Sequence, residues 1–237
     1  MQVFVYKNEA EVGKAAGMIV ASEILKKPDC ILGLATGSTP IPTYQEMIRM
    51  NKEGILDFSK VRSFNLDEYI GLSPEHVCSY RRFMNEQLFD HINIDKANTH
   101  VPDGLKCNAA EYEEMIHQAG GVDLQLLGIG TDGHIGFNEP ADEFVYPTNV
   151  VKLTEGTRKD NARFFNSLDE VPTSAISMGI GTIMSARRIL MIITGKNKAD
   201  TVVAALKGPV MPQMPASILR MHQNVLVLLD EDAASKL

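Results

Sequence analysis

Short apolar runs recur along the chain and alternate with longer segments of helical periodicity. The runs predict strands, and most of the segments between them predict helices. The expected strands cover residues 3–6, 30–34, 61–65, a run that begins at Leu124, 174–178, 188–193 and 225–229. The expected helices cover residues 8–27, 41–51, 79–89, 109–118, 158–165, 196–206 and a short stretch near Ile218. This alternation predicts an α/β fold with a doubly wound, mostly parallel seven-stranded sheet flanked by helices.

Two stretches lack a regular pattern. Residues 93–101 are expected to be irregular, and no periodicity is visible from Pro140 to about Thr157. The second stretch is long for a connection, and long loops beside active sites often act as lids, so we expect a lid segment at about 141–170. No repeat, linker or low-complexity segment interrupts the chain, which predicts a single domain over residues 1–237.

Composition and charge narrow the functional classes. Hydrophobic residues make up 44% of the 237 and charged residues 22%, as in soluble globular proteins with a full core. The net charge of −7, without a Lys/Arg cluster, argues against binding to nucleic acid or to an acidic membrane surface. No apolar run reaches the ~18 residues of a membrane span, and the first residues are too few for the apolar part of a signal peptide.

The cysteines add information about the compartment. There are three, at positions 30, 78 and 107, and none has Cys-x-x-Cys spacing. An odd number without such spacing argues against both a disulfide framework and a zinc site. We therefore expect reduced thiols in a cytoplasmic protein.

The most informative stretch is the loop after the strand that begins at Leu124. It contains Asp132, His134 and Glu139 among glycines at 128, 130, 133 and 136. Glycines at this density let the backbone turn tightly and approach a ligand closely, and a carboxylate beside a histidine fixes the imidazole tautomer and raises its basicity. The alternative is a glycine-rich turn with solvated charges. Three titratable groups just past a buried strand, at the edge where α/β sheets bind ligands, favour a catalytic loop.

A second loop has the composition of an anion site. It follows the strand at 30–34 and contains Thr36, Gly37, Ser38 and Thr39. A small, hydroxyl-rich loop between a strand and a helix presents backbone N–H groups and the helix dipole to an anion such as phosphate. The alternative is an ordinary helix cap, since Ser and Thr are good caps. The loop contains neither the Walker A pattern nor the G-x-G-x-x-G pattern.

Three further groups of charged residues accompany these loops. Lys196 and Lys198 lie at the start of a predicted helix, where a cation opposes the dipole and favours an anionic partner over free solvation. Arg163, in the expected lid segment, would complete an anion clamp, although alone it would be a solvated charge. Asp67 and Glu68 follow the strand at 61–65. The groups at 36–39, 67–68, 132–139 and 195–198 are expected to converge on one edge of the sheet.

At this point the chain resembles a known family, the glucosamine-6-phosphate deaminases. The resemblance rests on residues 34–40, 64–69, 130–140 and 163–165, covers nearly the whole chain, and is most specific in the third motif. It implies a Rossmann-like parallel sheet and conversion of glucosamine 6-phosphate and water to fructose 6-phosphate and ammonia. It also implies that the reaction needs no metal ion and no organic cofactor.

The resemblance implies a role for each matching residue. Asp67 matches the base that moves a proton from C2 to C1 of the opened sugar, and a carboxylate suits this task if burial raises its pKa. His134 matches the group that opens the pyranose ring, with Asp132 and Glu139 as its carboxylate partners. The phosphate site is matched by Thr36, Gly37, Ser38, Thr39, Arg163 and Lys198. Glu68 would point to the opposite side of a strand from Asp67, so we leave it out of the catalytic set.

Two alternatives share the expected fold. A 6-phosphogluconolactonase also has an Asp-Gly-His loop, but residues 138–140 and 64–69 resemble the deaminases instead. A sugar-phosphate-binding regulator usually has a helix-turn-helix domain before the first strand, whereas this chain starts with the strand and retains every candidate acid and base.

The sequence also predicts the type of regulation. Some deaminases of the family are hexamers activated by N-acetylglucosamine 6-phosphate, which binds between subunits through basic and hydroxyl residues. Here the matching positions hold Asn149 and Val151, and Asp142 and Glu143 would repel a second phosphate. We therefore expect no allosteric activation, and a monomer rather than a hexamer, with a small homo-oligomer as the alternative.

Overall fold

Seven parallel strands form the central sheet of the computed structural model, which describes residues 1–237 apart from the side chain of Asp160. The order across the sheet is β1-β10-β9-β6-β2-β3-β5. The strands are β1 (Gln2–Tyr6), β2 (Ile31–Leu34), β3 (Arg62–Asn65), β5 (Thr99–His100), β6 (Leu124–Leu127), β9 (Arg188–Ile193) and β10 (Val225–Asp230). The predicted fold class is confirmed.

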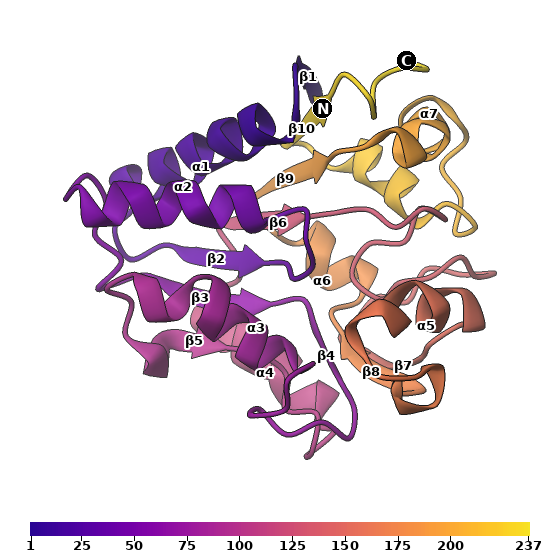
Figure 1. Ribbon diagram of the computed structural model, residues 1–237, viewed down its shortest axis with the longest axis horizontal. Coiled ribbons are helices and arrows are strands. Elements are labelled where there is room, and N and C mark those ends of the chain that lie inside the picture. Colours follow the sequence, from indigo (N-terminus) through magenta and orange to yellow (C-terminus); the bar gives the residue numbers. More distant parts are fainter.

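Helices cover both faces of this sheet (Figure 1). The helices of the chain are α1 (Glu9–Lys26), α2 (Ile41–Lys52), α3 (Tyr80–Gln87), α4 (Ala109–Ala119), α5 (Glu155–Asn161), α6 (Ile180–Met184) and α7 (Ala199–Lys207). Short 3-10 turns are η1 (Phe89–His91), η2 (Lys96–Asn98), η3 (Ala162–Phe164), η4 (Leu168–Glu170), η5 (Lys196–Lys198) and η6 (Pro215–Met221). One apolar core packs α1, α2 and α3 against one face, and a second packs α4, α6 and α7 against the other.

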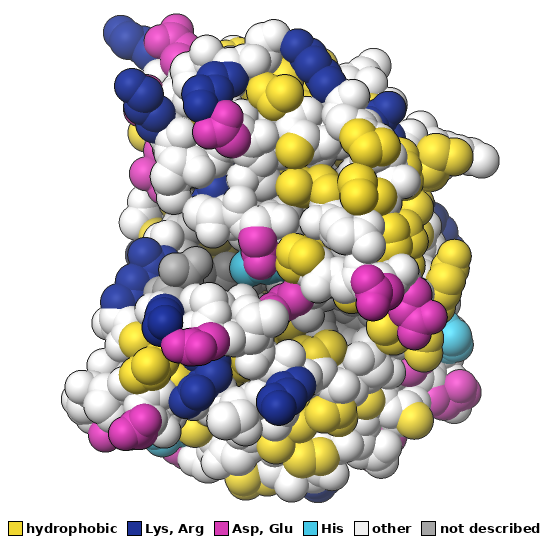
Figure 2. Space-filling view, turned by 90° about the vertical axis from the view of Figure 1, so that its right-hand side faces the viewer, with side chains coloured by type: hydrophobic (Ala, Val, Ile, Leu, Met, Phe, Trp, Pro, Cys, Tyr) yellow, Lys and Arg dark blue, Asp and Glu magenta, His cyan; other side chains and the backbone are white. Residues whose placement is uncertain are grey.

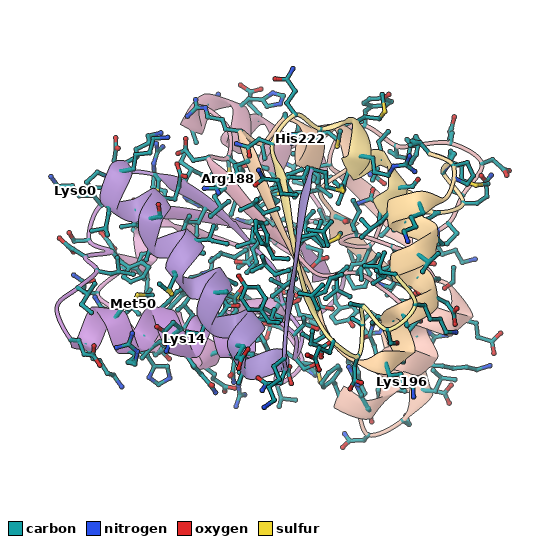
Figure 3. The ribbon with its side chains drawn as sticks, turned by 90° about the horizontal axis from the view of Figure 1, so that it is seen from above. Lys14, Met50, Lys60, Arg188, Lys196 and His222 are labelled. Carbon is teal, nitrogen blue, oxygen red and sulfur yellow. The ribbon has the colours of Figure 1, made fainter. Side chains whose placement is uncertain are left out.

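The direction of the strands decides where a ligand can bind. Arg188, which begins β9, and His222, just before β10, lie at one end of the sheet, and Lys196, just past β9, lies at the other (Figure 3). The strand order reverses between β2 and β6, since β3 and β5 extend to one side and β9, β10 and β1 to the other. Ligands of such sheets bind beyond the carboxyl ends of the strands at this switch point.

At the opposite end, one buried carboxylate ties β2 to β6. Asp123, which is 3% exposed, accepts hydrogen bonds from Ile31 N at 2.7 Å and Lys27 Nζ at 2.8 Å, and Arg187 also contacts it. Gly33 lets the two strands approach, because a Cβ there would lie 2.0 Å from Gln125 Oε1. The two strands whose loops face the switch point are therefore held in a fixed relation.

A second, smaller sheet differs from the sequence prediction. It is antiparallel, in the order β4-β8-β7, with β4 (Asp67–Tyr69), β8 (Ser174–Ser177) and β7 (Asn149–Lys152). Residues 174–178 form a strand as predicted, but the prediction that it joins the parallel sheet is wrong, because it pairs with β4 and β7. The remaining strand of the parallel sheet is β5, in a stretch that we expected to be irregular. Periodicity shows that a strand is buried, but not which strand it pairs with.

Candidate active site

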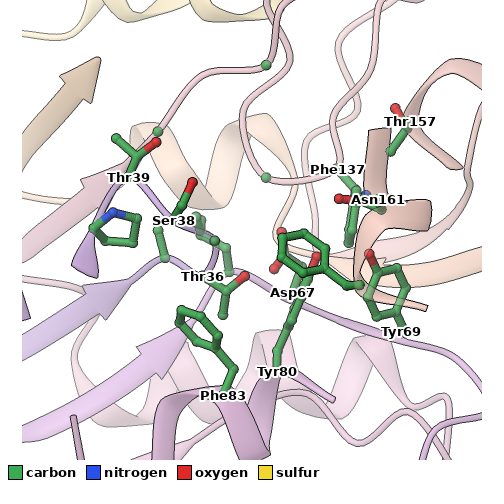
Figure 4. Close-up of a pocket in the computed structure, with 18 of the residues that line it drawn as sticks. Thr36, Ser38, Thr39, Asp67, Tyr69, Tyr80, Phe83, Phe137, Thr157 and Asn161 are labelled. Carbon is green, nitrogen blue, oxygen red and sulfur yellow. The ribbon is translucent and has the colours of Figure 1, made fainter. Parts of the chain in front are cut away.

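A cavity of about 450 Å³ opens at the carboxyl ends of the strands, at the switch point. Its lining includes most of the predicted site residues, namely Thr36, Gly37, Ser38, Thr39, Asp67, His134, Arg163 and Lys198. Thr36, Ser38 and Thr39 lie on one side, Asp67 and Tyr80 in the middle, and Tyr69, Phe137 and Asn161 on the other (Figure 4). Asp132 and Glu139 are not among the described residues that line the cavity.

The loop after β2 presents a helix start to the cavity. Gly37 has φ +94°, a backbone conformation that favours glycine, and Ile41 N donates to Ser38 O at 3.1 Å. The N-cap of α2 is Pro40, no side chain caps the helix, and its first turn contains no acid. The alternative of an ordinary Ser or Thr cap is therefore wrong. The positive end of α2 is left for an anion.

Two cations lie on the same cavity. Lys198 is half-buried in η5, after Gly195, whose backbone N–H donates to both carboxylate oxygens of Asp230 at 3.0 Å. Arg163 is exposed in η3, with its guanidinium carbon 4.7 Å from the centre of the Phe164 ring. Together with α2, they give the cavity an anion-binding side although the protein is acidic overall.

Asp67 is buried where β3 continues into β4. The residue is 6% exposed and pairs across the small sheet with Ser177. Burial and the nearby Glu68 carboxylate raise the pKa of Asp67 to about 8. A Cβ on Gly136 would lie 3.6 Å from Asp67 Oδ2, so the carboxylate lies against the loop that contains His134. A buried carboxyl group on a cavity is suited to proton transfer near neutral pH.

Glu68 points away from the cavity, as expected from strand alternation. Its carboxylate accepts hydrogen bonds from Tyr69 N at 2.9 Å, and from Tyr80 N and Arg81 N at 3.0 Å. Burial raises the pKa of Glu68, although these N–H groups stabilise its charged form. Glu68 therefore binds the first backbone N–H groups of α3, and it is a second buried carboxylate next to Asp67.

The burial of Asp67 predicts a pH-dependent stability difference. Because the pKa of Asp67 is raised in the folded protein, folding favours the protonated form, and this stabilisation is lost as pH rises through about 8. Relative to wild type, Asp67→Asn should therefore gain stability between pH 5 and pH 9, by on the order of a few kcal/mol. Urea unfolding at several pH values measures the difference. The exposed Asp142→Asn is the control, and an equal pH trend in both variants would contradict the burial effect.

His134 is held by Asp132. The imidazole Nδ1 is buried and lies 2.7 Å from Asp132 Oδ1, which also accepts the His134 backbone N–H at 3.1 Å. Burial raises the pKa of Asp132, but the close imidazole and the backbone N–H of His134 outweigh this, so the pKa of Asp132 lies below its usual value. A Cβ at Gly130 would lie 2.2 Å from the imidazole, so only glycine fits there. With Nδ1 held, Nε2 is the nitrogen that can act on a ligand.

Glu139 has a different neighbour. Its carboxylate oxygens accept the Thr154 backbone N–H at 3.2 and 3.3 Å, and the residue borders a second cavity of about 270 Å³. Thr154 is the N-cap of α5, within the segment 141–170. The structure thus brings Asp132 to His134, and places Glu139 against segment 141–170.

The sequence did not reveal an aromatic wall beside Asp67. The Tyr69 ring lies 4.9 Å from Tyr80, 5.6 Å from Phe137 and 5.7 Å from Phe165, measured between ring centres. These rings line the cavity. The sequence feature that could have indicated these rings is that Tyr69, Phe137 and Phe165 lie inside the motifs on which the resemblance rests. Asn161 and Thr157 also line the cavity, and no pattern in the sequence indicated them.

The wider surroundings of the site are mixed in charge. On the face that includes the small sheet and α5, Lys and Arg side chains lie among Asp and Glu side chains (Figure 2). Among the residues that the structure describes, no three His, Cys, Asp or Glu side chains gather in a way that could hold a metal ion. Within the same residues, no helix combines the length and apolarity needed to cross a bilayer.

Comparison with known proteins identifies the family. The model of the glucosamine-6-phosphate isomerases/6-phosphogluconolactonase matches residues 9–228. A glucosamine-6-phosphate deaminase of Clostridium perfringens strain SM101 is 52% identical over 241 residues, covering 100% of both chains. The chain belongs to the glucosamine-6-phosphate deaminase family. Another deaminase of this family, from Shewanella woodyi, is 52% identical and is covered to 91% of its length.

Solved structures agree with this assignment. A monomeric glucosamine-6-phosphate deaminase superposes with a TM-score of 0.97 at 44% identity, and the match covers 100% of each chain. The 6-phosphogluconolactonase of Thermotoga maritima superposes with a TM-score of 0.75 at 20% identity, over 97% of this chain and 99% of its own. At that identity the second comparison shows a shared fold only.

Proposed function

We propose that the protein is a glucosamine-6-phosphate deaminase, which converts D-glucosamine 6-phosphate and water to D-fructose 6-phosphate and ammonia. The observation that supports this most directly is a single cavity holding an anion-binding side, a buried carboxyl group and a carboxylate-held histidine. The second support comes from the deaminases that match over 91% and 100% of their own length. No metal or organic cofactor takes part in the proposed chemistry.

The phosphate would bind at the start of α2. Thr36, Gly37, Ser38 and Thr39 offer N–H and hydroxyl donors, and Lys198 and Arg163 add charge. This placement directs C1 and C2 of the sugar toward the middle of the cavity, where Asp67 lies (Figure 4).

His134 would open the ring and Asp67 would move the carbon-bound proton. His134 takes the proton of the O1 hydroxyl and returns one to O5 as the C1–O5 bond breaks, while Asp132 stabilises the imidazolium. Asp67 then takes the proton from C2, an enolamine forms, and Asp67 returns the proton to C1. The resulting imine at C2 adds water and loses ammonia. Glu139 would be a second carboxylate partner of His134 once segment 141–170 closes.

The next proposals concern the domain organisation, the oligomeric state and the location of the protein. We propose a single domain over residues 1–237 in which segment 141–170 acts as a lid, because it contributes Arg163 and Phe165 to the cavity. We also propose a monomer, which the solved monomeric relative supports, and a cytoplasmic location, which the cysteine pattern supports.

The direct test is ammonia release from D-glucosamine 6-phosphate by the purified protein. We expect saturable turnover that yields fructose 6-phosphate in equal amount. A regulator on the same fold would bind the sugar phosphate without releasing ammonia, and a lactonase would hydrolyse 6-phosphoglucono-δ-lactone instead. Either outcome would contradict the proposal.

Removing one cation should weaken phosphate binding. Lys198→Ala is expected to raise KM for glucosamine 6-phosphate by about 10- to 100-fold, equivalent to roughly 1.5–3 kcal/mol for a charged hydrogen bond. Non-phosphorylated glucosamine should remain a poor substrate that this change does not affect. The control is Lys196→Ala, an exposed lysine outside the cavity lining. The phosphate site is misplaced if both variants have the same KM.

The enzyme should not respond to N-acetylglucosamine 6-phosphate. The second cavity, beside β7, is lined by Glu139, Glu143, Asn149 and Val151, with Lys152 as the one cation among its described lining residues. Two acids and one lysine do not favour a phosphate. Initial rates against substrate concentration should be hyperbolic with and without the N-acetylated sugar phosphate. A sigmoidal curve that becomes hyperbolic on its addition would overturn this prediction.

A further inference from the structure

We propose that the C2 ammonium group of the bound amino sugar supplies the counter-charge that ionises Asp67, so that the carbon base forms only when an amino sugar phosphate occupies the cavity. This inference rests on the proposed function, because it takes Asp67 as the group that removes the C2 proton. It makes Asp67 a determinant of substrate specificity as well as a base.

The first support is the burial of Asp67 beside another acid. The residue is 6% exposed, and Glu68, the next residue on β4, is 2% exposed. Two neighbouring carboxyl groups out of water do not ionise together easily, and Glu68 has three backbone N–H donors that favour its own charge. Asp67 is therefore the member of the pair that stays protonated in the empty site at neutral pH, consistent with its raised pKa.

The second support is the kind of group that surrounds Asp67. From β4 and α3 these groups are Tyr69 and Tyr80, from α4 it is Tyr112, and from the loop after β6 they are Gly136 and Phe137. Burial raises the pKa of all three tyrosines, so they are neutral near pH 7.

The influences resolved on the pKa of Asp67 are its burial and the Glu68 carboxylate, and neither is a cation. Arg81 hydrogen-bonds to Thr99 through its guanidinium and has Glu68 as its acidic neighbour. His134 is held by Asp132. Lys198 and Arg163 line the same cavity and are assigned to the phosphate. The Asp67 carboxyl group therefore lies beside uncharged aromatic rings.

The substrate brings the missing charge. To lose its proton to Asp67, C2 must lie within reach of the carboxylate, and the amino group is bonded to C2. An opposite charge within about 4–6 Å typically lowers the pKa of a carboxyl group by about 1–3, which is enough to ionise Asp67 at neutral pH. The rings of Tyr69, Tyr80 and Phe137 can accommodate an ammonium group by cation–π attraction. On binding, the Asp67 proton passes to bulk water and the carboxylate then takes the C2 proton.

A close analogue without the amine should be rejected for the same reason. Glucose 6-phosphate has a neutral hydroxyl at C2, so it would bind through its phosphate and leave Asp67 protonated. It should therefore be neither isomerised nor exchanged at C2. Specificity of this kind uses the chemistry of the substrate itself and needs no group that sterically excludes the hydroxyl.

The test compares proton release on binding of two stable ligands, 2-amino-2-deoxy-D-glucitol 6-phosphate and D-glucitol 6-phosphate. Calorimetry at pH 7 in buffers of different ionisation enthalpy counts the protons. Because both ligands carry the same phosphate, the difference in proton release between them reports the effect of the amine. We expect close to one more proton released per site with the amine ligand, and no difference in Asp67→Asn.

Each result decides the question. Equal proton release by the two ligands in wild type at pH 7, or a difference that persists in Asp67→Asn, would overturn the proposal. If Asp67→Asn does not fold, wild type alone gives the decision, through the comparison of the two ligands at pH 7 and through hydrogen exchange at C2 of glucose 6-phosphate. Deuterium incorporation at C2 of glucose 6-phosphate at a rate near that of glucosamine 6-phosphate would also overturn it. Failure of the proposed function appears separately, as absence of ammonia release by wild type.

Discussion

Asp67→Asn is expected to lower kcat for deamination by about 10²–10⁴, the usual effect of losing a general base, while sugar phosphate binding persists. The asparagine keeps the shape of a side chain that is 6% exposed, but it cannot accept the proton from C2. Ammonia release gives kcat and KM, and D-glucitol 6-phosphate, which has no amine, reports binding alone.

The proton transfer itself can be followed with solvent deuterium. Wild type should incorporate label into recovered substrate and product, and Asp67→Asn should not. Asp142→Asn is the control, because Asp142 is exposed and lies outside the cavity lining, and this variant should retain turnover. Labelling by Asp67→Asn at the wild-type rate would show that another group is the carbon base.

His134→Gln should produce the second large loss, on the order of 10² or more in kcat/KM for the cyclic substrate. Glutamine retains a polar side chain, but it cannot carry a proton from O1 to O5. An open-chain analogue without the ring-forming hydroxyl bypasses this step, so its C2 proton exchange should be much less affected.

Asp132→Asn provides an intermediate case for the same step. It leaves the imidazole in place but removes the carboxylate 2.7 Å from Nδ1, so its loss should also be larger on the cyclic substrate. Equal losses on both substrates in His134→Gln would instead place His134 in the carbon proton transfer.

Much of the site could be predicted from local sequence because its parts are local structures. A strand followed by a small hydroxyl-rich loop and a helix can be recognised from composition, and in the structure α2 begins after Pro40 without a side-chain cap. The glycine-rich loop was predicted to be a catalytic loop, and in the structure Gly130 lies close to the His134 imidazole. Turn geometry and helix starts depend on neighbouring residues, so such signals survive in a single sequence.

The sequence by itself determined the alternation of strands and helices, the loops at their ends and the types of chemical group placed there, because periodicity and turn chemistry act over a few residues. Only the tertiary structure decided the rest. Residues 174–178 pair with β4 and β7, which buries Asp67 beside Glu68 and changes its acidity. The Glu139 carboxylate accepts the backbone N–H of Thr154, fifteen residues further along the chain, although Glu139 and His134 belong to the same loop. Pairing, burial and the contacts between distant segments depend on how the whole chain packs, and no local pattern encodes them.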